Sequence, residues 1–89
     1  MGLGLSIHSA RRLRDEPIEM RQLRHGYSPQ VFLWHGHCYR VHAVERCWTV
    51  VTRPYLDGRL CFRVRCAEGT FELYQDLFAN TWHVRGVRA

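Results

Sequence analysis

The chain has 89 residues, which is enough for one small domain and too few for a TIM barrel or a complete dinucleotide-binding fold. Its apolar fraction of 46% and charged fraction of 24% are ordinary for a globular protein. No apolar run approaches the roughly 20 residues of a membrane span, so we expect no membrane association. A domain of this size buries only a thin core, which leaves little room for a buried active site.

The charge balance is basic and rests on arginine alone. The 13 positive charges are all arginines, and together with 8 acidic residues they give a net charge of +5. The planar fork of the guanidinium group matches phosphate and carboxylate oxygens. The balance therefore favours nucleic acid or another acidic partner, although the same charge also serves solubility. We expect residues 1–15 to form a mobile basic arm, followed by a single β-domain over residues 16–89.

The first half of the domain is predicted to consist of short strands. Residues 18–23 alternate between apolar and polar side chains, and residues 25–29 have the composition of a loop. The dense apolar run 31–34 is followed by His35-Gly36, which suits a two-residue hairpin turn. We therefore expect an antiparallel hairpin here.

The returning strand carries an irregularity. Its apolar phase slips between Val41 and Val44, which predicts a β-bulge and a bend. Residues 47–52 continue as a strand, and residues 54–59 are expected to be a turn region.

The second half alternates more regularly. Residues 60–66 place apolar side chains and arginines on opposite faces, and Glu68-Gly69 is expected to close a tight hairpin. Strands follow at 70–75 and 82–87, separated by a longer turn at 76–81. Asp76 is expected to stabilise that turn, and Asn80 suits a left-handed backbone position. The whole pattern predicts an all-β fold: a small antiparallel sheet or a partly closed barrel of five to six strands.

The turn at Glu68-Gly69 would fix the pairing of its hairpin. It places Arg65 opposite Glu72 and Arg63 opposite Tyr74. A similar register across the next turn brings the last strand alongside, with His83 near Tyr74 and Arg85 near Glu72. One solvent-facing surface then carries a basic strip.

We take this strip as the candidate nucleic-acid-binding site. Arginine forks would hold phosphates, and a tyrosine ring beside them could stack on a base. The competing interpretation is a ladder of surface ion pairs with no ligand. The candidate residues are Arg63, Arg65, Tyr74, His83 and Arg85.

The cysteines and histidines give no strong sign of chemistry. The sequence shows no secretory signal, so we expect the protein to be cytoplasmic, where disulfides are rare. The four cysteines also form no C-x-x-C pair, so we expect all of them to be reduced and at least two of them to be buried. The densest ligand group is His35, His37, Cys38 and His42, but neighbouring strand residues point to opposite faces. We predict no metal and no cofactor. A Cys38–His83 pair lacks a third, orienting group, so we expect no enzyme activity.

Large aromatic rings are expected to fill the core, because they bury the most area per residue in a thin sheet. This predicted core contains Trp34, Tyr39, Trp48, Phe62, Phe71 and Trp82.

Two stretches of the sequence resemble a known family. The run from Phe32 to Val41, with Val44 and Trp48 after it, resembles the strand–turn–strand opening of a small bacterial β-domain family. Residues 71–76 with Trp82 are similar to its ending, and residues 16–19 to its first strand, so the resemblance covers residues 16–87. The resemblance implies a stand-alone protein or a neighbour of error-prone, Y-family DNA polymerases. It carries over no catalytic residues.

Two hypotheses of function follow. The first is a non-catalytic accessory module that associates with nucleic acid in bacterial DNA damage tolerance. The second is a protein-interaction module that docks through a sheet edge on a partner such as a DNA polymerase and makes no contact with nucleic acid. Binding through phosphates would weaken steeply with salt, whereas edge pairing would not.

Overall fold

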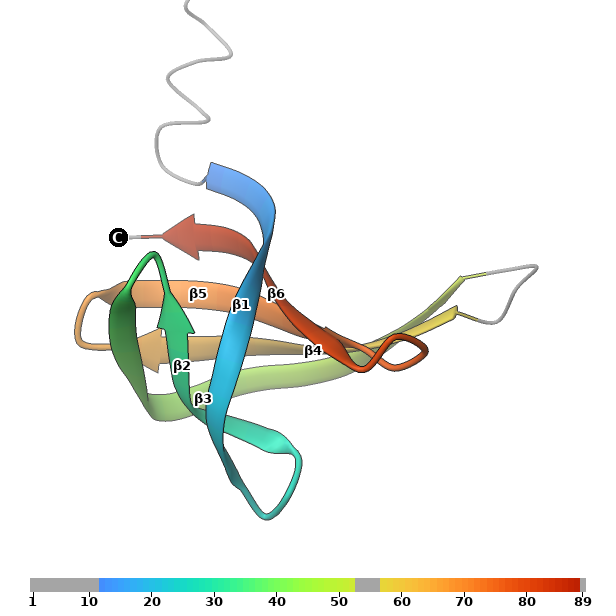
Figure 1. The fold of residues 1–89 in the computed structure, drawn as a ribbon, viewed down its shortest axis with the longest axis horizontal. Helices are drawn as coiled ribbons and strands as arrows, with labels where there is room; N and C mark the ends of the chain where they lie inside the picture. The colour runs from blue at the N-terminus through green and yellow to red at the C-terminus, as the bar shows by residue number, and fades with distance from the viewer. Residues whose placement is uncertain (1–11, 53–56, 89) are drawn as a thin grey trace, which may run out of the picture.

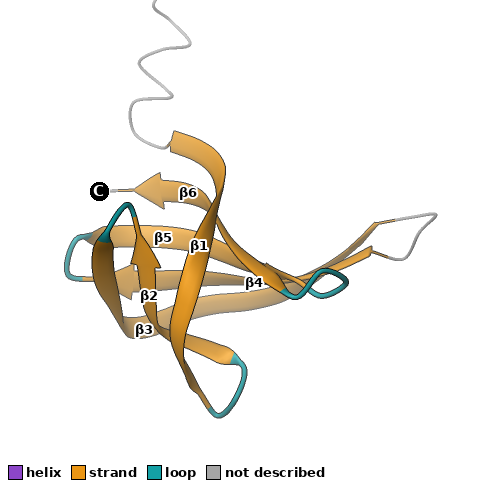
Figure 2. Cartoon of the chain, viewed as in Figure 1, coloured by secondary structure: helices purple, strands orange, loops and turns teal. Residues whose placement is uncertain are grey.

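The computed structural model describes residues 12–52 and 57–88, and all of its regular structure there is β-strand (Figure 2). Six antiparallel strands follow one another around a closed barrel, each hydrogen-bonded to the next, and the last strand pairs with the first (Figure 1). The strands are β1 (Arg12–Arg24), β2 (Ser28–Trp34), β3 (His37–Thr52), β4 (Asp57–Cys66), β5 (Gly69–Asp76) and β6 (Thr81–Arg88). The predicted all-β fold is confirmed, with the barrel closed and the strand number six.

The first strand begins earlier than the sequence suggested. β1 starts at Arg12 and pairs with β6 from Arg12↔Val87 to Ile18↔Trp82. Residues 12–15 therefore belong to the barrel and not to the basic arm, and the rest of the predicted arm, residues 1–11, lies outside the described residues. This segment shows no alternating period because the ladder is irregular between Leu13 and Glu16, where Asp15 has a positive φ of 60°.

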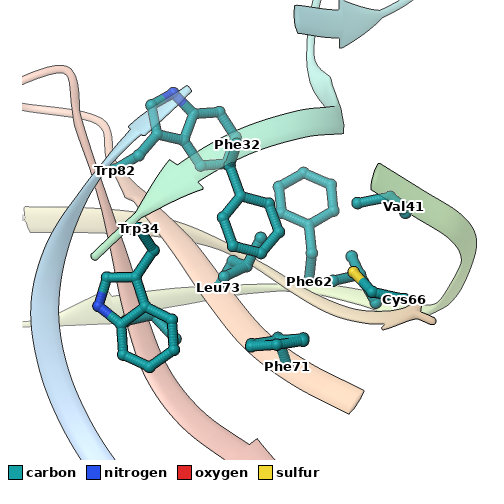
Figure 3. Close-up of a cluster of buried hydrophobic side chains, with 10 residues drawn as sticks. Phe32, Trp34, Val41, Phe62, Cys66, Phe71, Leu73 and Trp82 are labelled. Carbon is teal, nitrogen blue, oxygen red and sulfur yellow. The ribbon is translucent and has the colours of Figure 1, made fainter. Parts of the chain in front are cut away.

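Buried side chains from β2 to β6 fill the barrel interior (Figure 3), and Ile18 and Met20 of β1 pack against them. Phe32 and Phe62 are fully buried, and Phe32 meets Phe71 edge to face at 5.6 Å between ring centroids. Such edge-to-face pairs stabilise beyond the area that they bury. Of the six predicted core aromatics, Trp34, Phe62, Phe71 and Trp82 are buried and Tyr39 packs against the cluster.

The first hairpin has the predicted turn. β2 and β3 are joined by His35 and Gly36, both with positive φ, as two-residue hairpin turns favour. The bulge predicted in β3 is also present. The β3–β4 register shifts between Val41 and Ala43 and again between Val44 and Arg46, which lets one long strand bend around the barrel.

The hairpin between β4 and β5 turns one residue earlier than predicted. Its turn residues are Ala67 and Glu68, and Gly69 already pairs with Cys66. The register therefore differs by two residues from the expected one, which leaves every side chain on its predicted face but changes its partner. Both registers match apolar with apolar side chains, so the alternating pattern could not separate them.

The last turn is held from two sides. Asp76 Oδ1 accepts hydrogen bonds from the backbone N–H groups of Phe78 and Ala79, as predicted for this residue, and Asn80 has the expected left-handed φ of 58°. The N–H of Leu77 donates to the carbonyl of Gly58, at 2.9 Å. Gly58 belongs to β4, so the predicted turn over residues 54–59 is wrong for its end: Asp57 to Arg59 are strand.

Two hairpins leave the barrel in different directions. β1 stays paired with β2 as far as Arg24, beyond its last pair with β6 at Ile18. Likewise, β3 stays paired with β4 as far as Thr52, although its pairing with β2 ends at Arg40. Figure 1 shows the β1–β2 and β3–β4 hairpins projecting away from each other.

Candidate nucleic-acid interface

Four side chains form a row across the outer face of the barrel, perpendicular to the strands. Trp48 on β3 pairs with Cys61 on β4, Cys61 pairs with Tyr74 on β5, and Tyr74 pairs with His83 on β6. Directly opposed residues of antiparallel strands point to the same face, and the neighbours of this row, such as Phe62, point inward. We call Trp48, Cys61, Tyr74 and His83 the outer row.

Tyr74 is the most enclosed member of the outer row. Only 4% of it is exposed, although it lies on the outside of the barrel. The guanidinium carbon of Arg59 lies 4.4 Å from the ring centroid, and the His83 ring stacks on it at 4.8 Å. The hydroxyl donates a hydrogen bond to Asp15 Oδ1. Burial, and then this hydrogen bond, raises the pKa of Tyr74 to about 12.

These contacts correct the expected role of Tyr74. The sequence placed its ring beside the strip as a surface on which a base could stack. In the structure Arg59 and His83 occupy that position, and the ring is not accessible. Arg59 was absent from the predicted strip because it had been assigned to a turn.

The other half of the outer row is also covered. Cys61 is 4% exposed, and its burial raises the pKa of the thiol, an effect that the positive charges of Arg85 and Arg59 oppose. Trp48 is half-buried on this outer face, with the guanidinium of Arg46 at 4.8 Å from its ring. Trp48 was predicted as core. The sequence pattern placed it in phase with Val44, but a second register shift, between Val44 and Arg46, restores the earlier phase and turns Trp48 outward.

Arginines flank the outer row on both sides. Arg59 lies on one side, and Arg46, Arg63 and Arg85 lie on the other. Within the described residues, Arg46, Arg59 and Arg85 make no ion pair with a carboxylate. Arg46 stands directly opposite Arg63, and like charges in that position destabilise a sheet. We call the outer row and these four arginines the outer patch.

Two of the predicted strip residues are already paired. Arg63 contacts Glu72 at 3.1 Å, and Arg65 contacts Glu45 on β3 at 3.0 Å. The expected ladder through Arg65, Glu72 and Arg85 does not form, because the earlier turn places Thr70 opposite Arg65. His83 stacks on Tyr74 as predicted. Arg85 is exposed, beside the register shift of β6 between the partners of Glu72 and Leu73.

The structure therefore brings together only part of the predicted site and adds residues to it. Arg63, Tyr74, His83 and Arg85 share the outer patch, and Arg65 lies beyond it with Glu45. Arg46, Trp48 and Arg59 were missed. The signal that could have found Arg59 is the alternation of residues 59–65, in which every second residue is an arginine or Cys61.

The predicted ligand group around the first hairpin is dispersed. His35 Nε2 lies 2.8 Å from Glu16 Oε1, and His37 Nε2 lies 3.1 Å from Glu68 Oε2. The bond to His37 lowers the pKa of Glu68. Nowhere in residues 12–52 and 57–88 do three His, Cys, Asp or Glu side chains converge as metal ligands would.

All four cysteines are free thiols, and two of them, Cys61 and Cys66, are buried as predicted. Burial raises the pKa of Cys66 to about 11. The described part of the chain contains no helix of the length and apolarity needed to cross a membrane. Comparison of the chain with protein-family models, with curated proteins and with solved structures finds no match.

Proposed function

We propose that the protein is a non-catalytic module that binds nucleic acid through the backbone phosphates, using the outer patch. The observation that carries this proposal is the set of three arginines, Arg46, Arg59 and Arg85, that lie on one face and make no ion pair within the described chain, although Arg59 stands opposite Asp76 on β5. Guanidinium groups in that state offer open donor forks to phosphate oxygens. The opposition of Arg46 and Arg63 would also be relieved by an anion between them.

The enclosure of the Tyr74 and Trp48 rings by neighbouring side chains determines the expected mode of binding. Tyr74 has no accessible face, and Arg46 lies against Trp48, so contacts to phosphate are favoured over stacking on bases. Phosphate contacts carry no direct sequence information, so the expected binding is insensitive to sequence and sensitive to salt. An accessory role in bacterial DNA damage tolerance, in the cytoplasm, is the setting that the family resemblance implies.

The test compares two double variants of equal charge. Arg46→Ala with Arg85→Ala removes two arginines of the outer patch, and Arg24→Ala with Arg40→Ala removes two exposed arginines elsewhere. Binding of a fluorescent single-stranded oligonucleotide is followed by anisotropy over a range of salt concentrations. The first variant should bind roughly tenfold more weakly at low salt, with a salt slope lower by about 1.4 for two lost phosphate contacts.

The control variant should keep the wild-type slope. If the unmodified protein binds neither single- nor double-stranded nucleic acid at low salt, the proposal is wrong. An equal loss of affinity for the oligonucleotide in both double variants would also overturn the proposal, because binding would then depend on net charge and not on the outer patch.

A second candidate function rests on a different observation. Among residues 12–52 and 57–88, no strand pairs with the β6 side of β1 after Ile18, and this side borders an open groove of about 750 Å³. Apolar side chains of Ile18, Met20, Leu23 and Trp82 line part of this groove. An extended peptide of a partner protein, such as a DNA polymerase, could add there as a strand. A pull-down with and without nuclease separates the two functions. Leu23→Lys, at an exposed position of the groove, should abolish the capture of a partner that resists nuclease and leave nucleic-acid binding unchanged.

A further inference from the structure

The second strand edge that the barrel leaves open lies on β3. Its residues 41–52 pair with β4 on one side, and on the other side the pairing with β2 stops at Arg40. In the part of the chain that the structure describes, β3 makes substantial contact only with β2 and β4. The backbone groups on this side of residues 42–52 therefore have no partner strand there.

The far half of this edge lacks the usual protection against pairing. Natural sheet edges carry charges, prolines or bulges that discourage another strand. From Arg46 to Thr52 the register with β4 is continuous, and the segment Cys47–Thr52 has no charged residue and no proline. The side chains of residues 47–51 are mainly exposed, Val51 by 60%. Threonine, valine and tryptophan also favour strands.

The open edge of β1 is different. Residues 19–24 contain Glu19, Arg21 and Arg24, all exposed, and the register with β2 shifts twice between Met20 and Leu23. These are the devices that keep an edge from pairing with a copy of itself. Their absence from β3 sets its edge apart.

We propose that two copies of this chain pair through the β3 edges, antiparallel and around a two-fold axis at Thr49. A two-fold axis perpendicular to the sheet keeps the inner and outer faces continuous across the junction. Each residue therefore pairs with a residue of the second copy that lies on the same face. Because side chains alternate between the faces, the two residue numbers of a pair add to an even sum. Centred on Thr49, the seven residues Arg46–Thr52 are all matched.

This register is self-complementary. On the outer face Trp48 meets Val50 of the second copy, and on the inner face Cys47 meets Val51. Thr49 meets Thr49 at the axis, and paired threonines stabilise antiparallel sheets. Arg46 meets Thr52, so no like charges oppose each other. A closed, isologous dimer results, in which the β3 edges of both copies are paired.

The dimer does not depend on nucleic-acid binding. It does place the outer patches of both copies on the same side of one continuous sheet, because the two-fold axis preserves the faces. A long anionic ligand could then contact both copies at once, which raises the apparent affinity.

The first experiment measures the oligomeric state of the full chain by sedimentation velocity over a series of concentrations. The wild type is expected to be a dimer. Thr49→Lys places two ammonium groups against each other and should raise the dissociation constant about a hundredfold. Thr49→Glu should do the same, and a mixture of the two variants should restore the dimer through Lys–Glu contacts across the axis. That recovery would show that the variants fold.

Phe78→Lys is the control. Phe78 is 87% exposed on the turn between β5 and β6, away from the β3 edge, and this variant should remain dimeric. A wild type that is monomeric at every concentration would overturn the proposal. So would a dimer that survives both Thr49 variants, or one that Phe78→Lys alone dissociates.

A second experiment tests the register. In a Cys38→Ser, Cys47→Ser background, Thr49→Cys should form an intermolecular disulfide on mild oxidation, because opposed residues of antiparallel strands lie within disulfide range. Val50→Cys should not, since it meets Trp48 of the second copy. Equal cross-linking at both positions would show that the register around Thr49 is wrong.

Discussion

Strands β4 and β5 bury side chains on both of their faces, but by different means. On the inner face, Phe62 and Leu73 are enclosed by the other strands of the barrel and are 0% and 1% exposed. On the outer face, Cys61 and Tyr74 are almost as well enclosed, at 4% each, yet the cover consists of side chains alone. The guanidinium group of Arg59 lies over the ring of Tyr74, and that of Arg46 lies over the ring of Trp48.

A domain of this size can enlarge its thin core by burying side chains on the outer face of the sheet as well. Interior volume is limited by the number of strands, so additional burial must come from the outside of the sheet. The inner layer is apolar throughout, whereas the outer layer depends on charged side chains, on Arg59 above all. The two layers should therefore respond differently to truncation, to a buried hydroxyl and to pH.

The largest expected effect is in the inner layer. Phe62→Ala removes a fully buried ring and leaves a cavity, which should lower the free energy of unfolding by about 3–5 kcal/mol. Urea denaturation followed by tryptophan fluorescence measures this change. A loss below about 1 kcal/mol would mean that the interior collapses around the missing ring, and that the inner layer is no better packed than the outer one.

The two buried cysteines give a matched pair across the sheet. Cys66→Ser places a hydroxyl among apolar side chains and should cost about 1–3 kcal/mol. Cys61→Ser should cost less than about 1 kcal/mol, because the Cys61 sulfur already lies 4.0 Å from the carbonyl oxygen of Arg59, which can accept a hydrogen bond from the new hydroxyl. Thermal unfolding of both variants checks the order, and a reversal would contradict the assignment of the layers.

Tyr74→Phe removes one hydrogen bond from the outer layer and keeps the ring. We expect a loss of about 1 kcal/mol near neutral pH, because Asp15 is exposed and can be hydrated in place of the tyrosine hydroxyl.

The same variant has a signature in alkali. The pKa of Tyr74 is about 12 in the folded protein and ordinarily 10, so its contribution to stability is complete below pH 10 and is lost as the pH rises from 10 to 12. The wild type should therefore lose its advantage over the variant in this window. Melting temperatures at about pH 9 and about pH 11 test this. If the difference in melting temperature between the wild type and the variant is the same at both pH values, folding does not raise the pKa of Tyr74.

The smallest effect is expected from the pair of Arg65 and Glu45. Their side chains are 59% and 35% exposed, so Arg65→Ala should change the free energy of unfolding by less than about 1 kcal/mol. Equilibrium unfolding at low and high salt measures the contribution. A larger loss would place Arg65 with the arginines that cover the outer row.

Most of the fold could be predicted from the sequence, because alternation and turn residues determine which face each side chain takes. The turn at His35-Gly36 and the bulge after Val41 are correct for that reason. The register of β4 with β5 was missed, since a shift of two residues satisfies the same alternation. Closure of the barrel could not be predicted from local sequence patterns either, because it depends on the pairing of β1 with β6, which lie at opposite ends of the domain in sequence.

The candidate site was harder to predict. Sequence alternation places Tyr74 on the outer face, but it does not say that Arg59 and Asp15 cover it. That cover depends on the pairing of β4 with β5 and on the left-handed residue in β1, both of which are tertiary features. Arg65 was assigned to the strip for the same reason: its partner Glu45 lies on a strand that the alternation of β4 cannot reveal.

The pairing of β1 with β6 also has a consequence for the order in which the chain folds. The consecutive hairpins from β2 to β5 join strands that are near in sequence, whereas β1 must wait for a partner about 70 residues away. Contacts of such long range slow folding, so closure of the ladder between β1 and β6 is expected to be its late step. During synthesis, β6 is made after the other five strands of the barrel, and until then the chain exposes the edges of β1 and β5 together. Translation rate and chaperone binding while β6 is made should therefore influence the yield of folded protein more than events at any earlier hairpin.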